Sequence, residues 1–205
     1  MPRRYSMAKR AEEVDATRRQ ILDAVVDVAA ASGLEALTMQ AVAERADVAV
    51  RTVYNHFESR DDLVASALAR LAAETRSVGM SVTVDGRGPR DALLAFVDAY
   101  AGSYEAQGDG LRVLMDSLAV EVVADVVREV RTWRRRRLRS LVRAAEGSGD
   151  LRVPVAEAVD VAYLATAYAT WATLTGDMGL SASAARGLLR SLVDRSLFGG
   201  SGVSG

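Results

Sequence analysis

Several side chains suited to contact nucleic acid lie within one short stretch of the 205-residue sequence. Arg51 can bond guanine through O6 and N7 in bidentate fashion, and Asn55 can do the same for adenine. Thr52 can contact a thymine methyl or a phosphate, whereas Tyr54 and His56 are suited to phosphate contacts that set register without reading sequence. Because these residues follow one another so closely, the spacing predicts one short helix that presents them to a DNA groove.

Two short helices joined by a tight turn are expected to position these side chains. The pattern predicts helices over residues 38–46, opened by Thr38 as the N-cap, and 50–56. In such a helix-turn-helix the second helix lies in the major groove and the first crosses the backbone. Val53 and Phe57 are expected to face inward, which leaves these side chains for a ligand: Val50, Arg51, Thr52, Tyr54, Asn55 and His56.

Apolar residues recur at helical spacing along the rest of the chain, so the sequence predicts an all-α protein of about nine helices. A capping box at Ser59 opens one helix that continues through Leu71. We expect a DNA-binding domain over residues 1–60, a second helical domain over 61–200 and a tail over 201–205. The remaining helices are expected over residues 17–31, 91–105, 111–118, 122–146, 154–174 and 181–198.

Composition excludes several classes of chemistry. The chain has no cysteine and one histidine, His56, so thiol nucleophiles, disulfides, Cys/His zinc sites and paired-histidine metal sites are excluded. We therefore expect no metal and no cofactor. The sequence lacks an apolar run of ~18 residues, and its N-terminus lacks the apolar region of a signal peptide, so we expect a cytoplasmic protein with no membrane partner.

Residues 17–68, which include LTMQAVAERADVAVRTVYNHFESRDDLVASAL, resemble the DNA-binding region of the TetR (tetracycline-repressor type) family of transcriptional regulators. The run from Thr52 to Phe57, followed by Ser59 and Arg60, carries most of the likeness. The resemblance implies a homodimeric repressor that binds a double-stranded DNA operator and is released by a small-molecule effector, with an N-terminal three-helix helix-turn-helix domain and a C-terminal helical domain for effector binding and dimerisation. Carried over by position, the DNA contacts are Thr38, Arg51, Thr52, Tyr54, Asn55, His56 and Arg60.

Two positions depart from the family pattern. Asp47 stands in the turn where glycine is usual, and Asp tolerates positive φ better than most residues. Ala49 stands where a capping Ser or Thr is usual, so the second helix lacks a cap worth ~1 kcal/mol. We therefore expect the helix over residues 50–56 to be somewhat mobile without DNA.

The C-terminal helices are expected to form the dimer interface. After Glu157 and Asp160, the helix over residues 154–174 carries no charge and is apolar or small all round. A helix of this kind must be covered on every side, and a second subunit is the most economical cover. The helix over 181–198 is expected to pair with it in that interface.

An arginine-rich helix over residues 122–146 has eight basic residues and one acidic residue between Arg128 and Arg143. We interpret its main basic face as solvated, although a second nucleic-acid site is the alternative. Arg137 lies on the apolar side, where a charge is costly unless paired, so it is expected to hold an internal carboxylate or an acidic effector. The residues considered for an effector cavity are Phe96, Tyr100, Tyr104, Met115, Trp133, Arg137 and Tyr163.

Two alternative functions remain open at this stage. One is a helical small-molecule-binding protein that does not regulate DNA, and the other is a helical enzyme that uses carboxylates such as Asp98, Asp116 or Asp160. We expect no enzyme activity. The formal net charge of -1 is unusual for a DNA-binding protein. Residues 1–19 carry a local charge of +3 and residues 20–60 a local charge of -3, so we expect few phosphate contacts and a shallow salt dependence.

Overall fold

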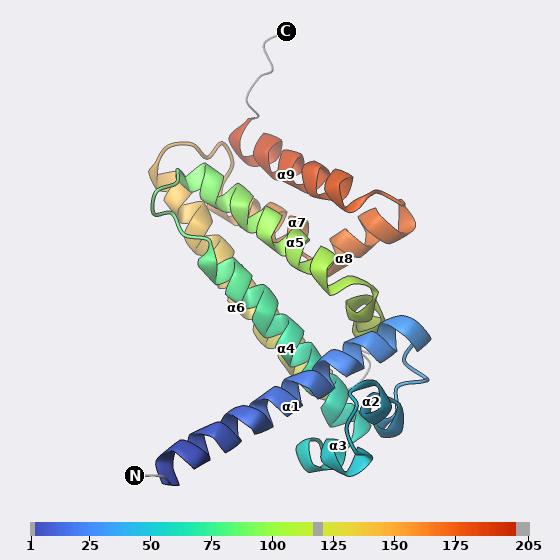
Figure 1. Ribbon diagram of the computed structural model, residues 1–205. Coiled ribbons are helices and arrows are strands. Elements are labelled where there is room, and N and C mark those ends of the chain that lie inside the picture. Colours follow the sequence, from blue (N-terminus) through green and yellow to red (C-terminus); the bar gives the residue numbers. More distant parts are fainter. Residues whose placement is uncertain (1–2, 117–120, 200–205) are drawn as a thin grey trace. The chain divides into compact units, whose positions relative to one another are not determined.

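The computed structural model describes residues 3–116 and 121–199, and within them it contains only helices, as the sequence predicts (Figure 1). The predicted tail over residues 201–205, the predicted helix end at residue 118 and the side chain of Asp116 lie outside what is described. In chain order the helices are α1 (Arg3–Ser32), α2 (Met39–Arg45), α3 (Val50–His56), α4 (Arg60–Ser81), α5 (Pro89–Asp116), α6 (Glu121–Gly147), α7 (Val155–Ala165), α8 (Tyr168–Ala172), the π-helix η1 (Thr173–Asp177) and α9 (Ala182–Phe198).

The chain divides into two compact units. Unit 1 comprises residues 1–71 and 108–126, and unit 2 comprises residues 72–107 and 127–205. Helix α4 therefore contributes residues to both units, as do α5 and α6. The domain boundary that the sequence analysis expects at residue 60 stays a prediction. None of the helices in the described part of the chain is long and apolar enough to span a membrane.

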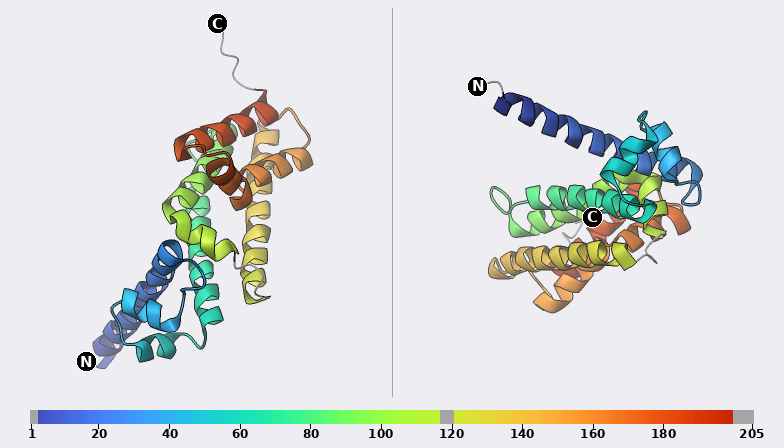
Figure 2. Two further views of the ribbon diagram at one scale, coloured as in Figure 1. Left: turned by 90° about the vertical axis from the view of Figure 1, so that its right-hand side faces the viewer. Right: turned by 90° about the horizontal axis from the view of Figure 1, so that it is seen from below.

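Unit 1 is built around the apolar stripe of α1. The residues that form this stripe are buried, while the first turns of α1 extend away from α2 and α3 (Figures 1 and 2). This helix is longer than the predicted 17–31, because residues 3–16 contain no helix breaker and exposed residues such as Lys9 and Glu13 form an i,i+4 pair. The buried stripe consists of Ile21, Leu22, Val25, Val28 and Ala29.

Helix α5 joins two of the predicted helices across a kink. Gly108 has φ 56° and ψ -152°, a backbone conformation that glycine adopts without strain, so the turn expected at residues 108–110 is a kink inside one helical segment. Beyond the kink, Gly110 packs against α1. A Cβ at Gly110 would lie 2.4 Å from Val26 Cγ1 and 2.7 Å from the Val26 carbonyl oxygen, so only glycine allows this approach.

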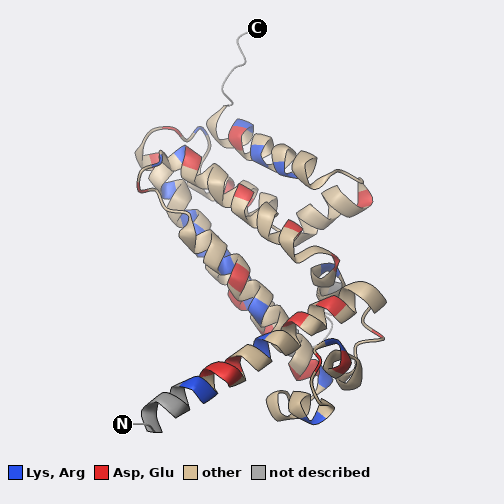
Figure 3. Ribbon diagram, viewed as in Figure 1, with Lys and Arg blue, Asp and Glu red and all other residues tan. Residues whose placement is uncertain are grey.

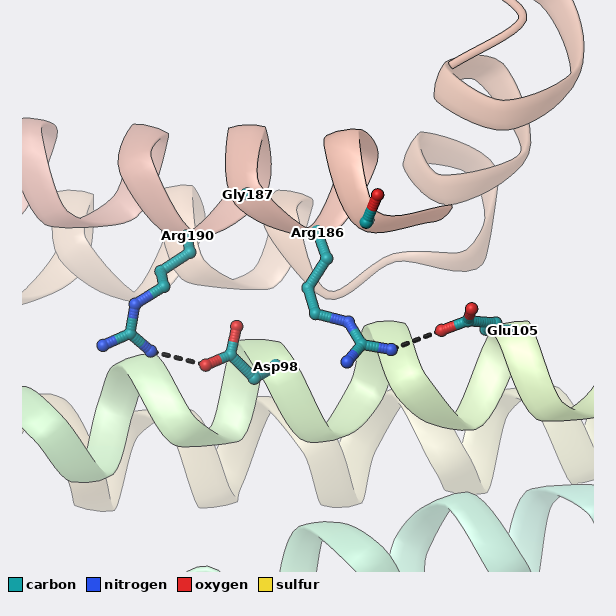
Figure 4. Close-up of a pocket in the computed structure, with 6 residues that line it drawn as sticks. Asp98, Glu105, Arg186, Gly187 and Arg190 are labelled. Atoms are coloured by element: carbon teal, nitrogen blue, oxygen red, sulfur yellow. Dashed lines mark hydrogen bonds and ion pairs between the residues drawn. The ribbon is translucent and has the colours of Figure 1, made fainter. Parts of the chain in front are cut away.

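In unit 2, aromatic rings and ion pairs hold the helices together. Helix α4 continues through the stretch that was predicted as a connection, and within it Gly79 faces the rings of Phe96, Tyr100 and Trp133. Figure 4 shows Arg190 and Arg186 of α9 reaching Asp98 and Glu105 of α5, and these four residues line a shallow pocket of about 290 Å³.

The prediction of a single helix over residues 154–174 is wrong, because the helix is interrupted after α7. Thr166 has non-helical geometry, and its carbonyl oxygen accepts from the Tyr104 hydroxyl at 2.9 Å and from Arg134 Nη1 at 2.7 Å. These buried side-chain donors take the place of the backbone N–H that would continue the helix. The chain resumes as α8 and η1, and α7 packs against α9.

Candidate functional site

Helices α2 and α3 and the turn between them form the predicted helix-turn-helix. Thr38 caps α2, because its Oγ1 accepts from the Ala41 backbone N–H at 3.1 Å. The turn passes through Asp47 with φ 51°, as expected for the residue that replaces glycine there. Ala49 supplies no side-chain cap, so the first N–H groups of α3 lack the acceptor that Ser or Thr would provide.

Helix α3 has an inward face and an outward face. Val53 and the following Phe57 are fully buried, as the pattern predicted. On the outward side Arg51, Tyr54 and Asn55 are exposed, and in the described part of the chain their side chains form no hydrogen bond or ion pair. The other three predicted contact residues on this helix, Val50, Thr52 and His56, are partly exposed.

Side chains of α1 hold both helices of the motif from behind. Gln20 Nε2 donates to the Ala46 carbonyl at the end of α2, at 2.7 Å. Arg18 Nη1 donates to the His56 carbonyl at the end of α3, at 3.0 Å, and its guanidinium lies 4.4 Å from the Phe57 ring centroid. In the sequence, Arg18 is one of the basic residues that give residues 1–19 their local charge of +3. In the structure it caps the C-terminal end of α3.

Arg60 also has a different place from the one the sequence suggested. Its Nε donates to the Leu37 carbonyl at 2.8 Å and its Nη2 donates to the Leu34 carbonyl at 2.7 Å. These bonds tie the start of α4 to the segment that leads into Thr38. The guanidinium thus positions the motif within unit 1, and because the side chain is still partly exposed, its DNA contact stays a prediction.

The capping box predicted at the start of α4 is present in modified form. The Asp62 backbone N–H donates to Ser59 Oγ at 3.1 Å, while Asp62 Oδ2 accepts from the Glu58 backbone N–H at 3.0 Å. In the usual box the carboxylate accepts from the capping residue itself, so here the reciprocal bond is shifted by one residue. The two bonds fix the turn that follows α3.

The charges around this motif are mixed. Figure 3 shows acidic and basic residues together on α1 and α2. Arg45 at the end of α2 pairs with Asp27 at 2.6 Å, and Arg70 of α4 pairs with Asp23 at 2.9 Å. With Arg18, Arg45 and Arg60 engaged internally, Arg51 is the basic residue of the motif that the structure leaves open to a ligand.

Known proteins share this arrangement. Residues 21–67 match the model of the family described as bacterial regulatory proteins, tetR family. Residues 21–67 therefore form a DNA-binding region of the tetR-family type. The chain's repressor-type relatives include the HTH-type transcriptional repressor KstR of Rhodococcus jostii, which is 38% identical over 132 residues, or 53% of this chain and 60% of that protein. KstR of Mycolicibacterium smegmatis is 55% identical over 53 residues, 26% of each protein.

The fold of the chain also has solved counterparts. The crystal structure of a TetR-like transcriptional regulator from Rhodococcus sp. RHA1 matches with a TM-score of 0.65 over 88% of this chain and 94% of that one, at 21% sequence identity. In sequence, the chain matches 60% of the Rhodococcus jostii KstR and 26% of the Mycolicibacterium smegmatis KstR. The likeness in fold covers 88% of this chain.

The residues predicted for an effector site are mostly brought together in unit 2. Phe96, Tyr100 and Tyr104 form a buried stack along α5, with ring centroids 4.7 Å and 6.0 Å apart. Trp133 and Tyr163 are partly exposed next to this stack. Met115 falls in unit 1, so the structure does not join it to the group.

Burial changes the ionisation of this tyrosine stack. Tyr104 lies in an interior where the tyrosinate form is poorly solvated, which raises its pKa to about 12. Burial likewise raises the pKa of Tyr100. Both phenols therefore stay neutral at a pH where an exposed tyrosine ionises.

The buried cation of α6 is Arg134, which the sequence reading missed. Arg134 is 6% exposed, whereas Arg137 is partly exposed and donates to the Val82 carbonyl rather than to a carboxylate. A helical wheel places Arg137 at the centre of the apolar side of this helix. In the structure, however, the carbonyl that the helix break leaves free at Thr166 accepts from Arg134. The only available signal was a second arginine next to that apolar side.

The remaining arginines of α6 behave as a solvated face. Arg128, Arg131, Arg136, Arg139 and Arg143 are exposed, as is Arg135, which pairs with Asp160 at 2.6 Å. Two of the carboxylates considered for catalysis form ion pairs: Asp160 pairs with Arg135 and Asp98 pairs with Arg190. No group of three or more His, Cys, Asp or Glu side chains suited to a metal ion is found among the described residues.

Proposed function

We propose that this protein is a cytoplasmic, DNA-binding transcriptional regulator that represses its target and is released from its operator by a small apolar or amphipathic molecule. The observation that carries the proposal is the outward face of α3, where Arg51, Tyr54 and Asn55 are exposed and unpaired within the described residues. Arg and Asn are the residue types that read guanine and adenine in the major groove. The repressor names of the KstR relatives support the direction of control.

The proposed binding mode places α3 in the major groove and leaves α2 across the backbone. Thr38, Val50, Thr52, Tyr54 and His56 then contact phosphates or base edges around the two reading residues. A small number of phosphate contacts per subunit gives a shallow salt dependence, since each neutralised phosphate contributes about -0.9 to the slope of log K against log salt.

We further propose a homodimer formed through α7 and α9. Leu164 of α7 is 63% exposed, and Leu188 and Leu192 of α9 are 46% and 49% exposed. The sequence places Leu188 and Leu192 on the apolar stripe expected in the dimer interface, and unit 2 leaves both exposed. A second subunit covers such residues most simply, and two α3 helices then lie about 34–36 Å apart, one turn of DNA.

Release follows from a shift between conformations. An effector that binds better to a conformation with a different spacing of the two α3 helices moves the population away from DNA. Helix α4 is the proposed lever, because it begins at the bonds that Arg60 makes to the segment before Thr38 and contributes residues to both units.

The test is selection of bound sequences from a random duplex library, followed by titration of salt and by a ligand screen for release. The proposal expects one preferred, two-fold-related sequence and an affinity that falls only moderately with salt. Binding that does not depend on sequence would refute it. A slope as steep as that of ten or more neutralised phosphates would mean that the arginine face of α6 also contacts DNA.

A further inference from the structure

Arg134 is a buried cation without a counter-ion. The residue is 6% exposed, and in the described part of the chain it forms no ion pair. Its guanidinium lies 4.3 Å from the ring centroid of Tyr163 and 5.8 Å from that of Tyr100. Removing a charge from water is costly unless an opposite charge compensates for it, and aromatic rings compensate only in part.

Two polar groups in this neighbourhood also lack a partner. Arg134 Nε is buried and has no acceptor, and the hydroxyl of Tyr100, a residue that is 1% exposed, is buried with no hydrogen-bond partner. Buried polar groups in native proteins nearly always have partners. An unmatched N–H donor and an unmatched phenol beside the same guanidinium indicate that an acceptor group belongs there.

The fold does not need the charge of Arg134 to satisfy the helix break. Arg134 Nη1 donates to the Thr166 carbonyl at 2.7 Å, but the Tyr104 hydroxyl donates to the same oxygen at 2.9 Å. The carbonyl would keep a donor if Arg134 were absent. A neutral residue in place of Arg134 would therefore still leave the Thr166 carbonyl with a hydrogen-bond donor. The helix break thus does not account for a buried positive charge.

We infer that Arg134 and the Tyr100 hydroxyl form the anion-binding end of a ligand site, and that the ligand is an amphipathic monocarboxylate with an apolar body. The guanidinium supplies the charge-assisted bonds and the phenol supplies one further donor. The rings of Phe96, Tyr104 and Tyr163 contact the apolar body. Tyr163 is the partly exposed member of these three rings.

This inference rests on the proposed function, since it names the chemical class of the effector at the same site. One charge favours a carboxylate over a dianionic phosphate, because Arg134 is the buried cation and the nearby phenols stay neutral. Burial raises the pKa of Tyr100 and raises that of Tyr104 to about 12, so neither adds negative charge against the ligand at pH 7.

The test compares acids with their neutral amides. Calorimetry with octanoate, decanoate and 4-phenylbutyrate, each against the matching amide, uses the full chain. We expect at least one acid to bind the wild-type protein ten-fold or more tightly than its amide, and Arg134→Gln to abolish that preference. Arg139→Gln, an exposed arginine on the same helix, is the matched control and should leave it unchanged.

An absence of acid preference in the wild-type protein, or a preference that survives Arg134→Gln, would overturn the inference. A second measurement does not depend on the probes: Arg134→Met should raise the Tm of the ligand-free protein, because it removes an uncompensated buried charge. A lower Tm would show that the fold needs the guanidinium and would also overturn it. DNA binding is measured on the same proteins, so acid preference without DNA binding would count against the proposed function alone.

Discussion

Arg18 of α1 closes the C-terminal end of α3 by donating from Nη1 to the carbonyl oxygen of His56 at 3.0 Å. The same side chain lies over Phe57 and donates from Nη2 to Ser66 Oγ at 3.2 Å. A cation at a helix C-terminus satisfies an orphan carbonyl and interacts favourably with the helix dipole. One partly buried arginine therefore sets where the proposed recognition helix ends.

Replacing Arg18 with Met should lower the free energy of unfolding by about 2 kcal/mol, because the apolar stem is kept while the charge-assisted bonds are lost. Urea unfolding measures the change. Arg19→Met, at the exposed neighbouring position, is the control and should be near neutral. Equal stabilities of the two variants would show that the His56 bond contributes nothing.

Adding the missing cap should order α3. Ala49→Thr is expected to stabilise the helix by ~1 kcal/mol, since a hydroxyl at the N-cap accepts from an unsatisfied backbone N–H. Amide exchange in α3 should then slow about five-fold, whereas Ala49→Val, which has the same shape without the hydroxyl, should not slow it. In the unmodified protein, α3 amides should exchange faster than those of α1. Equal protection of the two helices would contradict this expectation.

Gly79 tests how tightly the rings of unit 2 are packed. A Cβ at this position would lie 3.0 Å from Phe96 Cε2 and 3.1 Å from both Trp133 Cη2 and Tyr100 Cε2. Gly79→Ala should therefore destabilise the protein by about 1–3 kcal/mol through overpacking. Gly187→Ala is the matched helical control, because a Cβ there meets no atom within 4 Å, and it should be neutral or stabilising. A Tm of Gly79→Ala above that of Gly187→Ala would contradict the tight packing around Gly79.

The secondary structure of unit 1 follows from local signals in the sequence. Thr38, the positive φ of Asp47 and the uncapped Ala49 act within a few residues of the chain, so their roles could be predicted. The roles of Arg18 and Arg60 could not be predicted, because each meets its acceptors across 20 residues or more. The sequence showed Arg18 only as part of the local charge of residues 1–19, and the family resemblance named Arg60 as a DNA contact.

The predictions that failed in unit 2 also failed because the deciding contacts join residues far apart in the sequence. At the helix break, the Thr166 carbonyl accepts from Tyr104 and Arg134, which lie on other helices, so no local signal in the sequence marks the break. Helix periodicity identified the buried face of α5, including Phe96 and Tyr100, since that face is a property of one helix. Which arginine of α6 is buried depends on the neighbouring helices and was assigned incorrectly.

Tyr104 should make stability fall at alkaline pH. Its pKa rises from an ordinary value near 10 to about 12 on folding, so the folded state retains the proton that the unfolded state loses. The associated stability is complete below pH 10 and is lost as pH rises towards 12, on the order of 2 kcal/mol. Tyr104→Phe should flatten this decline in urea unfolding between pH 9 and 11.5. An unchanged decline would assign the effect to other groups.

The central claim is that the outward face of α3 reads DNA. The direct measurement is the affinity of the wild-type protein, Arg51→Ala and Asn55→Ala for a duplex selected from a random library and for its single-base variants. Each substitution should cost about 1–3 kcal/mol on the selected duplex and relax discrimination at one base pair, while Arg139→Ala changes neither quantity. Wild-type affinity that is equal for selected and random duplexes, or variants that bind as tightly as wild type, would contradict the account.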